Sequence, residues 1–290
     1  MTTLQPLAVT GATGHLGGLV ARLLDAAGTP HRLVVRDPTS PRLPTHATVT
    51  EVTAASFGDL DAATRALDGV RVLFMVSAAE SVDRLDQHRT FIDAAAAAGV
   101  QHVVYTSFLG AAPDATFTLA RDHHATEEHL RASGMVWTFL RDSFYLDFTE
   151  ALVGADGVIR GPAGEGACAF VARADVARVA AAVLGEPAAH TNRSYELTGP
   201  EALTLRDVAA TISAVRGTDV TFHDESLDEA YASRAGYGAP DWQVDAWVST
   251  YTAIASNAMA HVSTAVQDLA GSAPLSLATY LRTTGASPGI

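Results

Sequence analysis

Residues 10–17 read Thr-Gly-Ala-Thr-Gly-His-Leu-Gly and stand between a short apolar run and an Ala- and Leu-rich stretch. Three glycines at this spacing, between a buried strand and a helix, predict a tight turn that joins the two. In such a turn Gly11 adopts backbone angles that other residues avoid, and Gly14 lets the main chain approach a ligand closely. Gly17 lets the helix pack against the sheet. The octet therefore predicts the first turn of an α/β domain.

The open N–H groups at the start of the following helix favour a negatively charged ligand at this turn. A dinucleotide pyrophosphate is the ligand that best fits a glycine turn in this setting. The motif leaves open a turn without a ligand and a mononucleotide or flavin site. The cofactor contacts expected here are Gly11, Ala12, Thr13, Gly14, His15, Leu16 and Gly17.

Apolar runs of strand length alternate with amphipathic stretches of helix length over the first half of the chain. This rhythm predicts a doubly wound parallel sheet of the Rossmann type, with helices on both faces and ligands at the carboxyl ends of the strands. The expected strands are residues 4–10, 32–36, 48–53, 72–77, 103–107 and 136–141, and the expected helices are 17–27, 60–67, 82–98 and 119–133.

The rhythm breaks after about residue 145. We therefore expect a dinucleotide-binding domain at 1–145 and, at 146–290, a smaller α+β lobe that mainly binds substrate, some of its segments completing the sheet. The expected elements of this lobe are a loop or hairpin at 154–166, a helix at 173–184, a strand at 194–198, a helix at 203–215 with a Thr204–Asp207 capping box, a strand at 220–223, a helix at 240–259 and a frayed tail at 285–290.

Charge and composition narrow the class of protein. The formal net charge is -13, and all 19 basic residues are Arg, so the chain contains no Lys. This acidic balance argues against general binding to nucleic acid or to an anionic membrane. No apolar run approaches the roughly 20 residues that span a bilayer, and the first strand begins too early to leave room for a signal peptide. The single cysteine, Cys168, excludes an internal disulfide, and we expect a cytoplasmic protein.

The second expected strand ends in Arg36-Asp37, about twenty residues beyond the first glycine, where the adenosine ribose of a dinucleotide would lie. An acidic side chain there favours the free 2′-hydroxyl of NAD, whereas a guanidinium favours the 2′-phosphate of NADP. Arg36 stands at the strand edge and Pro38 turns the chain away after Asp37. The sequence therefore favours NADP, with NAD and a surface ion pair between Arg36 and Asp37 left open.

Several motifs in order along the chain resemble those of the atypical short-chain dehydrogenase/reductases of the NmrA-like group, near the bacterial quinone oxidoreductase and triphenylmethane reductase branch. The resemblance covers nearly the whole chain. The matching segments are residues 10–17, 34–36, 67–70, 74–77, 97–107, 122–123, 126–127, 133–134, 138–141, 173–177 and 195–200. The resemblance implies an NAD(P)-dependent fold and further cofactor contacts at Val76, Ser77 and Phe144.

The chain departs from the wider superfamily at its acid catalyst. Typical members carry a Ser after the fifth strand and Tyr-x-x-x-Lys on the next helix, where Lys lowers the pKa of Tyr and Tyr protonates the acceptor. Ser107 matches the Ser, but Leu119 and His123 stand where Tyr and Lys would be. The resemblance makes His123 the candidate for hydrogen bonding to the nicotinamide ribose, with a plain surface histidine as the alternative.

Proton supply must then come from another group. The candidates are Thr106 and Ser107 at the end of a central strand and Tyr145 after the sixth strand, although an aromatic at the position of Tyr145 more often packs against the nicotinamide or the substrate than acts as an acid. Without a neighbouring cation a Tyr is a weak acid at neutral pH. An acceptor that needs little acid help, such as a quinone or a polycyclic aromatic, fits this set best. His124 and His129 have poor spacing for metal ligation, and no metal site is expected.

Two function classes remain. One is a reductase that passes hydride from NADPH to a quinone, ketone or conjugated aromatic acceptor. The other is a regulator that binds NAD(P) and signals to a partner protein, as members of the NmrA-like group also do. The glycine turn suits both, whereas the aromatic-rich C-terminal part favours the enzyme. A homodimer is left open.

Overall fold

A computed structural model describes residues 6–284 of the chain. Contacts divide the chain into two compact units, each built from several segments. The first unit contains the described part of Met1–Phe108 with Asp122–Arg141 and Val176–Tyr195, and the second contains Leu109–Arg121, Asp142–Asp175 and the described part of Glu196–Ile290. A single boundary at residue 145 does not describe this grouping. The functional division into a cofactor-binding part, 1–145, and a substrate-binding part, 146–290, stays a prediction.

The central sheet has seven strands in the order β3-β2-β1-β4-β5-β6-β9, and the pairs from β3 to β5 are parallel. Because sequence order reverses at β1, the sheet is doubly wound, and the Rossmann-type α/β prediction is confirmed. β9, from the second half of the chain, lies beside β6 at one edge. The strands are β1 (Leu7–Thr10), β2 (His31–Val35), β3 (Val49–Ala54), β4 (Val72–Met75), β5 (His102–Phe108), β6 (Val136–Asp142) and β9 (Arg193–Leu197).

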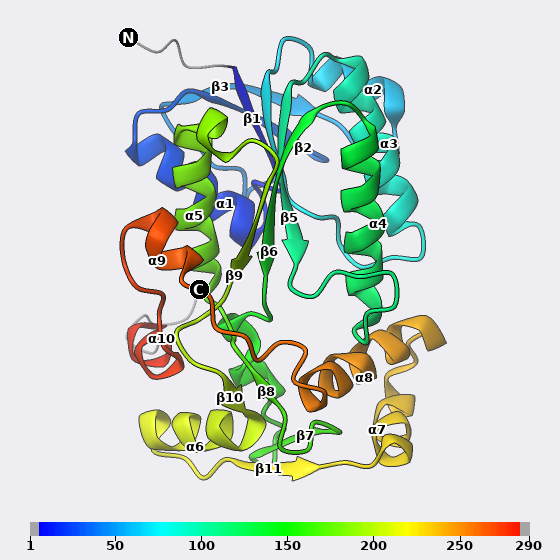
Figure 1. Cartoon of the computed structure of the whole chain (residues 1–290), viewed down its shortest axis with the longest axis vertical. Helices are drawn as coiled ribbons and strands as arrows, with labels where there is room; N and C mark the ends of the chain where they lie inside the picture. Colours follow the sequence, from blue (N-terminus) through cyan, green and yellow to red (C-terminus); the bar gives the residue numbers. More distant parts are fainter. Residues whose placement is uncertain (1–5, 285–290) are drawn as a thin grey trace. The chain divides into compact units, whose positions relative to one another are not determined.

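Helices cover both faces of this sheet. α1 (His15–Ala26) and α5 (Arg173–Gly185) lie on one face, and α2 (Leu60–Ala66), α3 (Arg84–Ala97) and α4 (Thr118–Ala132) lie on the other (Figure 1). The core between the sheet and this second group includes the fully buried side chains of Phe91, Tyr105, Leu130 and Phe139. This burial holds the carboxyl ends of β4 and β5 in fixed positions next to α3 and α4.

Every helix and strand expected in the first 145 residues is present, with ends shifted by a few residues. The largest shift at a strand end is at β4, expected to run to residue 77 but ending at Met75. It ends there because the next three backbone N–H groups bind side chains and leave the strand ladder. Part of the expected first strand and the expected tail at 285–290 lie outside the described residues.

The second unit carries two small sheets. β7 (Val158–Gly161) pairs in parallel with β11 (Thr221–Asp224), and β8 (Ala167–Cys168) pairs antiparallel with β10 (Leu203–Thr204). The loop or hairpin expected at 154–166 is present in part, because Val153 and Ile159 form an isolated antiparallel bridge around a turn. β7 itself pairs along its length with β11, some sixty residues later in the chain. The further helices of the chain are α6 (Leu205–Arg216), α7 (Leu227–Arg234), α8 (Asp241–Ala255), α9 (Ala265–Ala270) and α10 (Leu277–Thr284), with short 3-10 turns at Leu146–Phe148, Glu150–Leu152, Pro187–His190 and Ala235–Tyr237.

Two expectations for this unit meet different outcomes. The capping box of α6 is confirmed, because the side chains of Thr204 and Asp207 each bind the other's backbone N–H. The helix expected at 240–259 is present as α8 but ends at Ala255, and in it Ile254 is buried while Trp242, Trp247 and Tyr251 are only partly buried. The aromatic rings of this helix are therefore in contact with both the protein interior and solvent.

Candidate active site

The glycine turn between β1 and α1 has the geometry that the sequence predicts. Gly11 lies in the left-handed region at φ +67°, and its carbonyl accepts the N–H of Gly14 at 2.9 Å. A Cβ on Gly17 would lie 2.4 Å from the carbonyl carbon and oxygen of Gly11, so no other residue fits without moving the backbone. α1 begins after Gly14 with no side-chain cap and no acidic residue in its first turn. The exposed turn thus offers uncapped N–H groups to an anion, as a pyrophosphate requires.

Arg36 and Asp37 at the end of β2 do not pair with each other. The carboxylate of Asp37 accepts the backbone N–H and the hydroxyl of Thr39, at 2.8 and 2.6 Å. Arg36 is exposed, and no hydrogen bond or ion pair to another described residue engages its guanidinium. A phosphate at this strand end could therefore bind the guanidinium of Arg36, while the carboxylate of Asp37 is held by its hydrogen bonds to Thr39.

The segment that follows β4, residues 76–78, is fixed by three buried side chains. The N–H of Val76 binds the hydroxyl of Thr10 on β1 at 2.8 Å. The N–H of Ser77 binds the hydroxyl of Thr106 on β5 at 2.9 Å. The N–H of Ala78 binds Nε2 of His88 on α3 at 2.8 Å. Each N–H thus has its own acceptor, and the segment is rigid without a strand partner.

This arrangement also shows the surroundings of Thr106, one of the expected catalytic residues. Its side chain is 2% exposed, and its oxygen serves as the acceptor for Ser77. The same segment touches the glycine turn, since a Cβ on Gly11 would lie 3.1 Å from Cβ of Val76. The structure therefore brings the glycine turn, Val76, Ser77 and Thr106 together at the carboxyl edge of the sheet.

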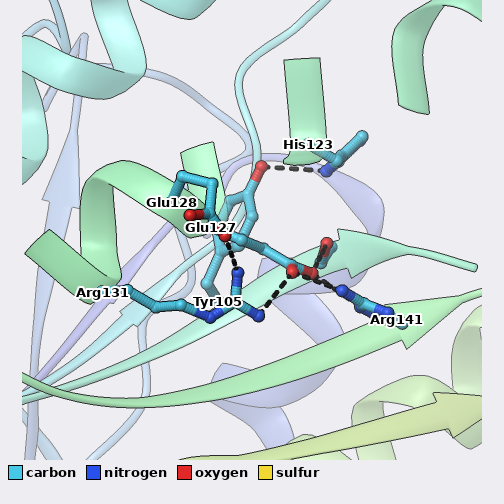
Figure 2. Close-up of polar contacts among 7 residues, drawn as sticks. Tyr105, His123, Glu127, Glu128, Arg131 and Arg141 are labelled. Atoms are coloured by element: carbon cyan, nitrogen blue, oxygen red, sulfur yellow. Dashed lines mark hydrogen bonds and ion pairs between the residues drawn. The ribbon is translucent and has the colours of Figure 1, made fainter. Parts of the chain in front are cut away.

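His123 lies on α4 and is buried between two partners. Its Nδ1 contacts the hydroxyl of Tyr105 at 2.9 Å, and its Nε2 contacts the guanidinium of Arg84 at 2.9 Å (Figure 2 shows the first contact). A guanidinium only donates, so Nε2 is the acceptor and Nδ1 carries the proton. Burial, and then the charge of Arg84, lowers the pKa of His123 well below its usual value. The imidazole is therefore neutral, and both of its nitrogens are engaged within the protein, so the surface-histidine alternative is wrong.

Ser107 points into a buried ionic cluster on the same face of β5 as Tyr105. Its hydroxyl donates to the carboxylate of Glu127 at 2.6 Å, and both side chains are fully buried. Glu127 also accepts two hydrogen bonds from Arg141, at 2.8 and 2.5 Å, and one from Arg131 at 3.1 Å (Figure 2). Among the described residues, the exposed Glu128 pairs with Arg131 alone. The proton of Ser107 is thus committed to a carboxylate, and its proposed catalytic role requires that bond to break.

Tyr145 and Phe144 belong to the second unit. The phenol of Tyr145 donates to the carboxylate of Asp142, which is 4% exposed at the end of β6. The guanidinium of Arg173 lies 4.9 Å above the ring of Tyr145. Phe144 packs edge-on against Phe117, with ring centroids 5.1 Å apart.

The pKa values of this pair follow from burial. Burial raises the pKa of Asp142 to about 7, against the opposing hydrogen bond from Tyr145. Burial, and then the negative charge of Asp142, raises the pKa of Tyr145 well above its usual range in spite of Arg173. Tyr145 is therefore a weaker acid than an exposed tyrosine.

His129 and Cys168 each have a partner inside the protein, and Cys168 contacts the hydroxyl of Ser143 at 3.5 Å. His129 forms an ion pair with Asp93 at 2.7 Å near the surface of α4. Within residues 6–284 no three His, Cys, Asp or Glu side chains are grouped to hold a metal ion. Cys168 is fully buried, and burial raises the pKa of its thiol to about 12. None of the described helices is long and apolar enough to span a membrane.

The residues that sequence reasoning missed are Arg84, His88 and Glu127. Arg84 and His88 lie one turn apart on α3, and Glu127 follows His123 by one turn on α4, so each pair shares a helix face. The spacing was available as a signal. The sequence did not indicate their partners on other elements, because those contacts join residues 10 to 39 positions apart.

An uncapped glycine turn at the switch point of a doubly wound sheet defines a Rossmann-type dinucleotide-binding protein. Residues 11–187 match the model of a family described as NAD(P)H-binding. This match covers more than half of the sequence, and the chain belongs to that family. The expected atypical short-chain dehydrogenase/reductase fold and NAD(P) cofactor are confirmed.

Named relatives extend the likeness. Quinone oxidoreductase 2 of Escherichia coli is 38% identical over 244 residues, 82% of this chain and 84% of the relative. The crystal structure of an NADPH-dependent quinone oxidoreductase from E. coli, complexed with NADPH, matches with a TM-score of 0.86 at 34% identity, over 96% of this chain and 99% of that one. Triphenylmethane reductase from Citrobacter sp., complexed with NADP(H), matches with a TM-score of 0.84 at 30% identity, over 96% and 99%.

The regulator NmrA, in complex with NAD, shares the fold with a TM-score of 0.77 but only 17% identity, over 97% of this chain and 95% of that one. At this identity the likeness concerns the fold alone. The relatives closest in sequence to this chain among those above are oxidoreductases, and the chain is an NAD(P)H-dependent oxidoreductase by family.

Proposed function

We propose that the chain reduces a quinone or a related conjugated aromatic with NADPH, without the Tyr-Lys pair of the wider superfamily. The observation that carries this proposal is the combination of an intact pyrophosphate turn with the absence of a ready acid. The names of the relatives support the acceptor class, since they reduce quinones and triphenylmethane dyes.

The choice of NADPH rests on the end of β2. The exposed guanidinium of Arg36 has no partner among the described residues, and Asp37 is turned back onto Thr39. A 2′-phosphate gains charge-assisted hydrogen bonds from such a guanidinium, whereas the 2′-hydroxyl of NADH lacks the acidic partner that it prefers. The glycine turn would hold the pyrophosphate through its exposed backbone.

The bound cofactor would supply a hydride, and the acceptor must also gain a proton. Ser107 donates to Glu127, Thr106 accepts from Ser77, and Tyr145 donates to Asp142. The protons of Ser107 and Tyr145 are committed to carboxylates, and the Thr106 hydroxyl, which keeps its proton while it accepts from Ser77, is an aliphatic alcohol and a very weak acid at neutral pH. A quinone meets this condition, because hydride addition produces a stabilised phenolate that water protonates.

The test is anaerobic oxidation of NADPH by the purified chain, followed at 340 nm, with a panel of benzoquinones, naphthoquinones, triphenylmethane dyes and simple ketones. We expect turnover with quinones and little with isolated ketones. Binding of NADP(H) without turnover of any acceptor would refute the enzyme and favour the regulator. Equal rates for quinones and ketones would refute the argument from the missing acid.

The other expectations remain part of this proposal. We place the protein in the cytoplasm and expect no nucleic acid or membrane partner, on the grounds of its acidic charge and single buried cysteine. A homodimer stays a prediction, which size-exclusion chromatography with light scattering would test.

A further inference from the structure

We propose that Arg84 and His88 are positioning residues, which hold the segment 76–78 in the shape that seats the nicotinamide half of the cofactor. The proposal rests on the function proposed above, in that it takes NADP(H) as the ligand of the glycine turn.

Sheet order indicates which half of the dinucleotide meets this segment. β1 carries the pyrophosphate turn, with β2 on one side and β4, followed by β5, on the other. The adenosine ribose lies at the end of β2, where Arg36 is. A dinucleotide that crosses the carboxyl edge of the sheet therefore places its nicotinamide half at the ends of β4 and β5. Residues 76–78 continue directly from β4.

His88 fixes the N–H side of this segment through a directed chain of hydrogen bonds. Its Nε2 accepts the N–H of Ala78 at 2.8 Å, and its Nδ1 contacts the hydroxyl of Thr126 at 2.9 Å. That hydroxyl donates to the backbone carbonyl of Asp122 at 2.7 Å, so its oxygen accepts from Nδ1. His88 is fully buried, and burial lowers its pKa to about 3. One neutral tautomer thus ties the segment to α4.

Arg84 fixes the carbonyl side of the same residue. Its Nε donates to the carbonyl of Ala78 at 3.0 Å, and one terminal nitrogen donates to His123 at 2.9 Å. The other terminal nitrogen is buried without a hydrogen bond among the described residues, and its ion-pair partner Asp122 lies 3.5 Å away. Ala78 is therefore held by both of its peptide groups, from two residues one turn apart on α3.

The burial of Arg84 argues against a purely structural role. Its side chain is 5% exposed, and its one carboxylate partner is too far for a good hydrogen bond. A buried charge paired this loosely costs stability compared with an apolar side chain of similar size. A guanidinium is needed here if one side chain must donate to two groups at once: Nε of Arg84 donates to Ala78, and a terminal nitrogen donates to His123.

The experiment compares two ligands on the full chain by isothermal titration calorimetry: NADP⁺, and 2′,5′-ADP, which carries only the adenosine half. The variants are Arg84→Lys, which keeps the charge but loses the fork, and His88→Gln, whose amide can both accept from Ala78 and donate to Thr126. Arg89→Lys is the matched control, an exposed arginine on α3 that pairs with Asp86 on the same helix.

We expect Arg84→Lys to raise the Kd for NADP⁺ about tenfold, the loss of one good charge-assisted hydrogen bond, and to change the Kd for 2′,5′-ADP less than twofold. His88→Gln should stay within threefold of wild type for both ligands, and amide hydrogen exchange in residues 76–78 should accelerate in Arg84→Lys alone. Retained 2′,5′-ADP binding shows that each variant is folded.

An unchanged Kd for NADP⁺ in Arg84→Lys, or an equal loss of both ligands in a variant whose far-UV circular dichroism matches that of wild type, would overturn the proposal. If Arg84→Lys does not fold, His88→Leu, which removes the acceptor for Ala78, must show the same selective loss of NADP⁺. These measurements use no acceptor, so a failure of quinone turnover would refute the proposed function and leave this result standing.

Discussion

Glu127 carries a fully buried charge at the centre of an ionic cluster in the first unit, and Glu127→Gln tests how much stability that charge contributes. The carboxylate is fully buried and accepts four hydrogen bonds, three of them from the guanidinium groups of Arg131 and Arg141. The amide keeps the shape but removes the charge, and its NH₂ group turns one acceptor into a donor that faces other donors.

Removing one partner of a buried ion pair costs about 3–5 kcal/mol. Arg141 and Arg131 keep 21% and 32% of their side chains exposed, so water can solvate part of the freed charge. We therefore expect the low end, a loss of about 3 kcal/mol in the free energy of unfolding. Ser107 would lose its acceptor as well.

The assay is equilibrium urea unfolding followed by far-UV circular dichroism, with the transition of the first unit fitted separately if the two units unfold in sequence. Glu128→Gln is the control, because Glu128 is 58% exposed and, within residues 6–284, its side chain pairs with Arg131 alone. This variant should lie within about 0.5 kcal/mol of wild type. Equal effects of the two substitutions would refute the view that burial makes Glu127 important.

Three further outcomes follow from the site. Arg36→Ala should weaken NADPH binding roughly 10- to 100-fold and NADH binding little, whereas the control Arg42→Ala should change neither; an equal loss for both cofactors by calorimetry would contradict the 2′-phosphate assignment. Gly17→Ala should abolish NADPH binding or unfold the first unit, because its Cβ would lie 2.4 Å from backbone, while Gly185→Ala, with open space around it, should be tolerated. His88 stays neutral in the folded chain down to a pKa of about 3, but the unfolded chain takes up its proton below about 6.5, so this residue's contribution is complete above 6.5 and lost as pH falls. Wild type should therefore lose about 1.4 kcal/mol more than His88→Gln between pH 7.5 and 5.5 in urea unfolding, and parallel profiles would exclude the effect.

The fold of the first half could be predicted because its signals are local. The glycine octet, the apolar strand runs and the helix periodicity each lie within one short segment, and so does the Thr204–Asp207 cap. The pairing of β7 with β11 could not be predicted from the loop or hairpin expected at 154–166, because the partner strand lies some sixty residues away and no local pattern identifies it.

The site shows the same division. The glycine turn and Arg36 are recognisable from sequence, because a turn conformation and a strand end are local features. Ser107 was recognised by position alone, and the sequence gives no sign that the buried Glu127 takes its proton. The cofactor contact that the resemblance implies for His123 stays a prediction, and the sequence gives no sign that Arg84, 39 residues earlier, binds its Nε2. Contacts between helices and strands determine which donor and acceptor atoms of a side chain are already engaged, and local sequence patterns do not show these contacts.

The bond between Tyr145 and Asp142 bears on which molecules such an enzyme would turn over. If the proposed function holds, the phenol of Tyr145 gives up its proton too reluctantly to help the reaction. The rate for each acceptor then depends on how basic its oxygen becomes after the carbon framework takes up a hydride. Hydride addition turns a quinone into a stabilised phenolate, which is a weak base and needs no protein acid. The same step turns an isolated ketone into an alkoxide, which is a strong base and forms slowly without a proton donor. Two compounds of the same outline would then differ in rate through their electronics, and the breadth of the substrate range would be set by chemistry more than by shape.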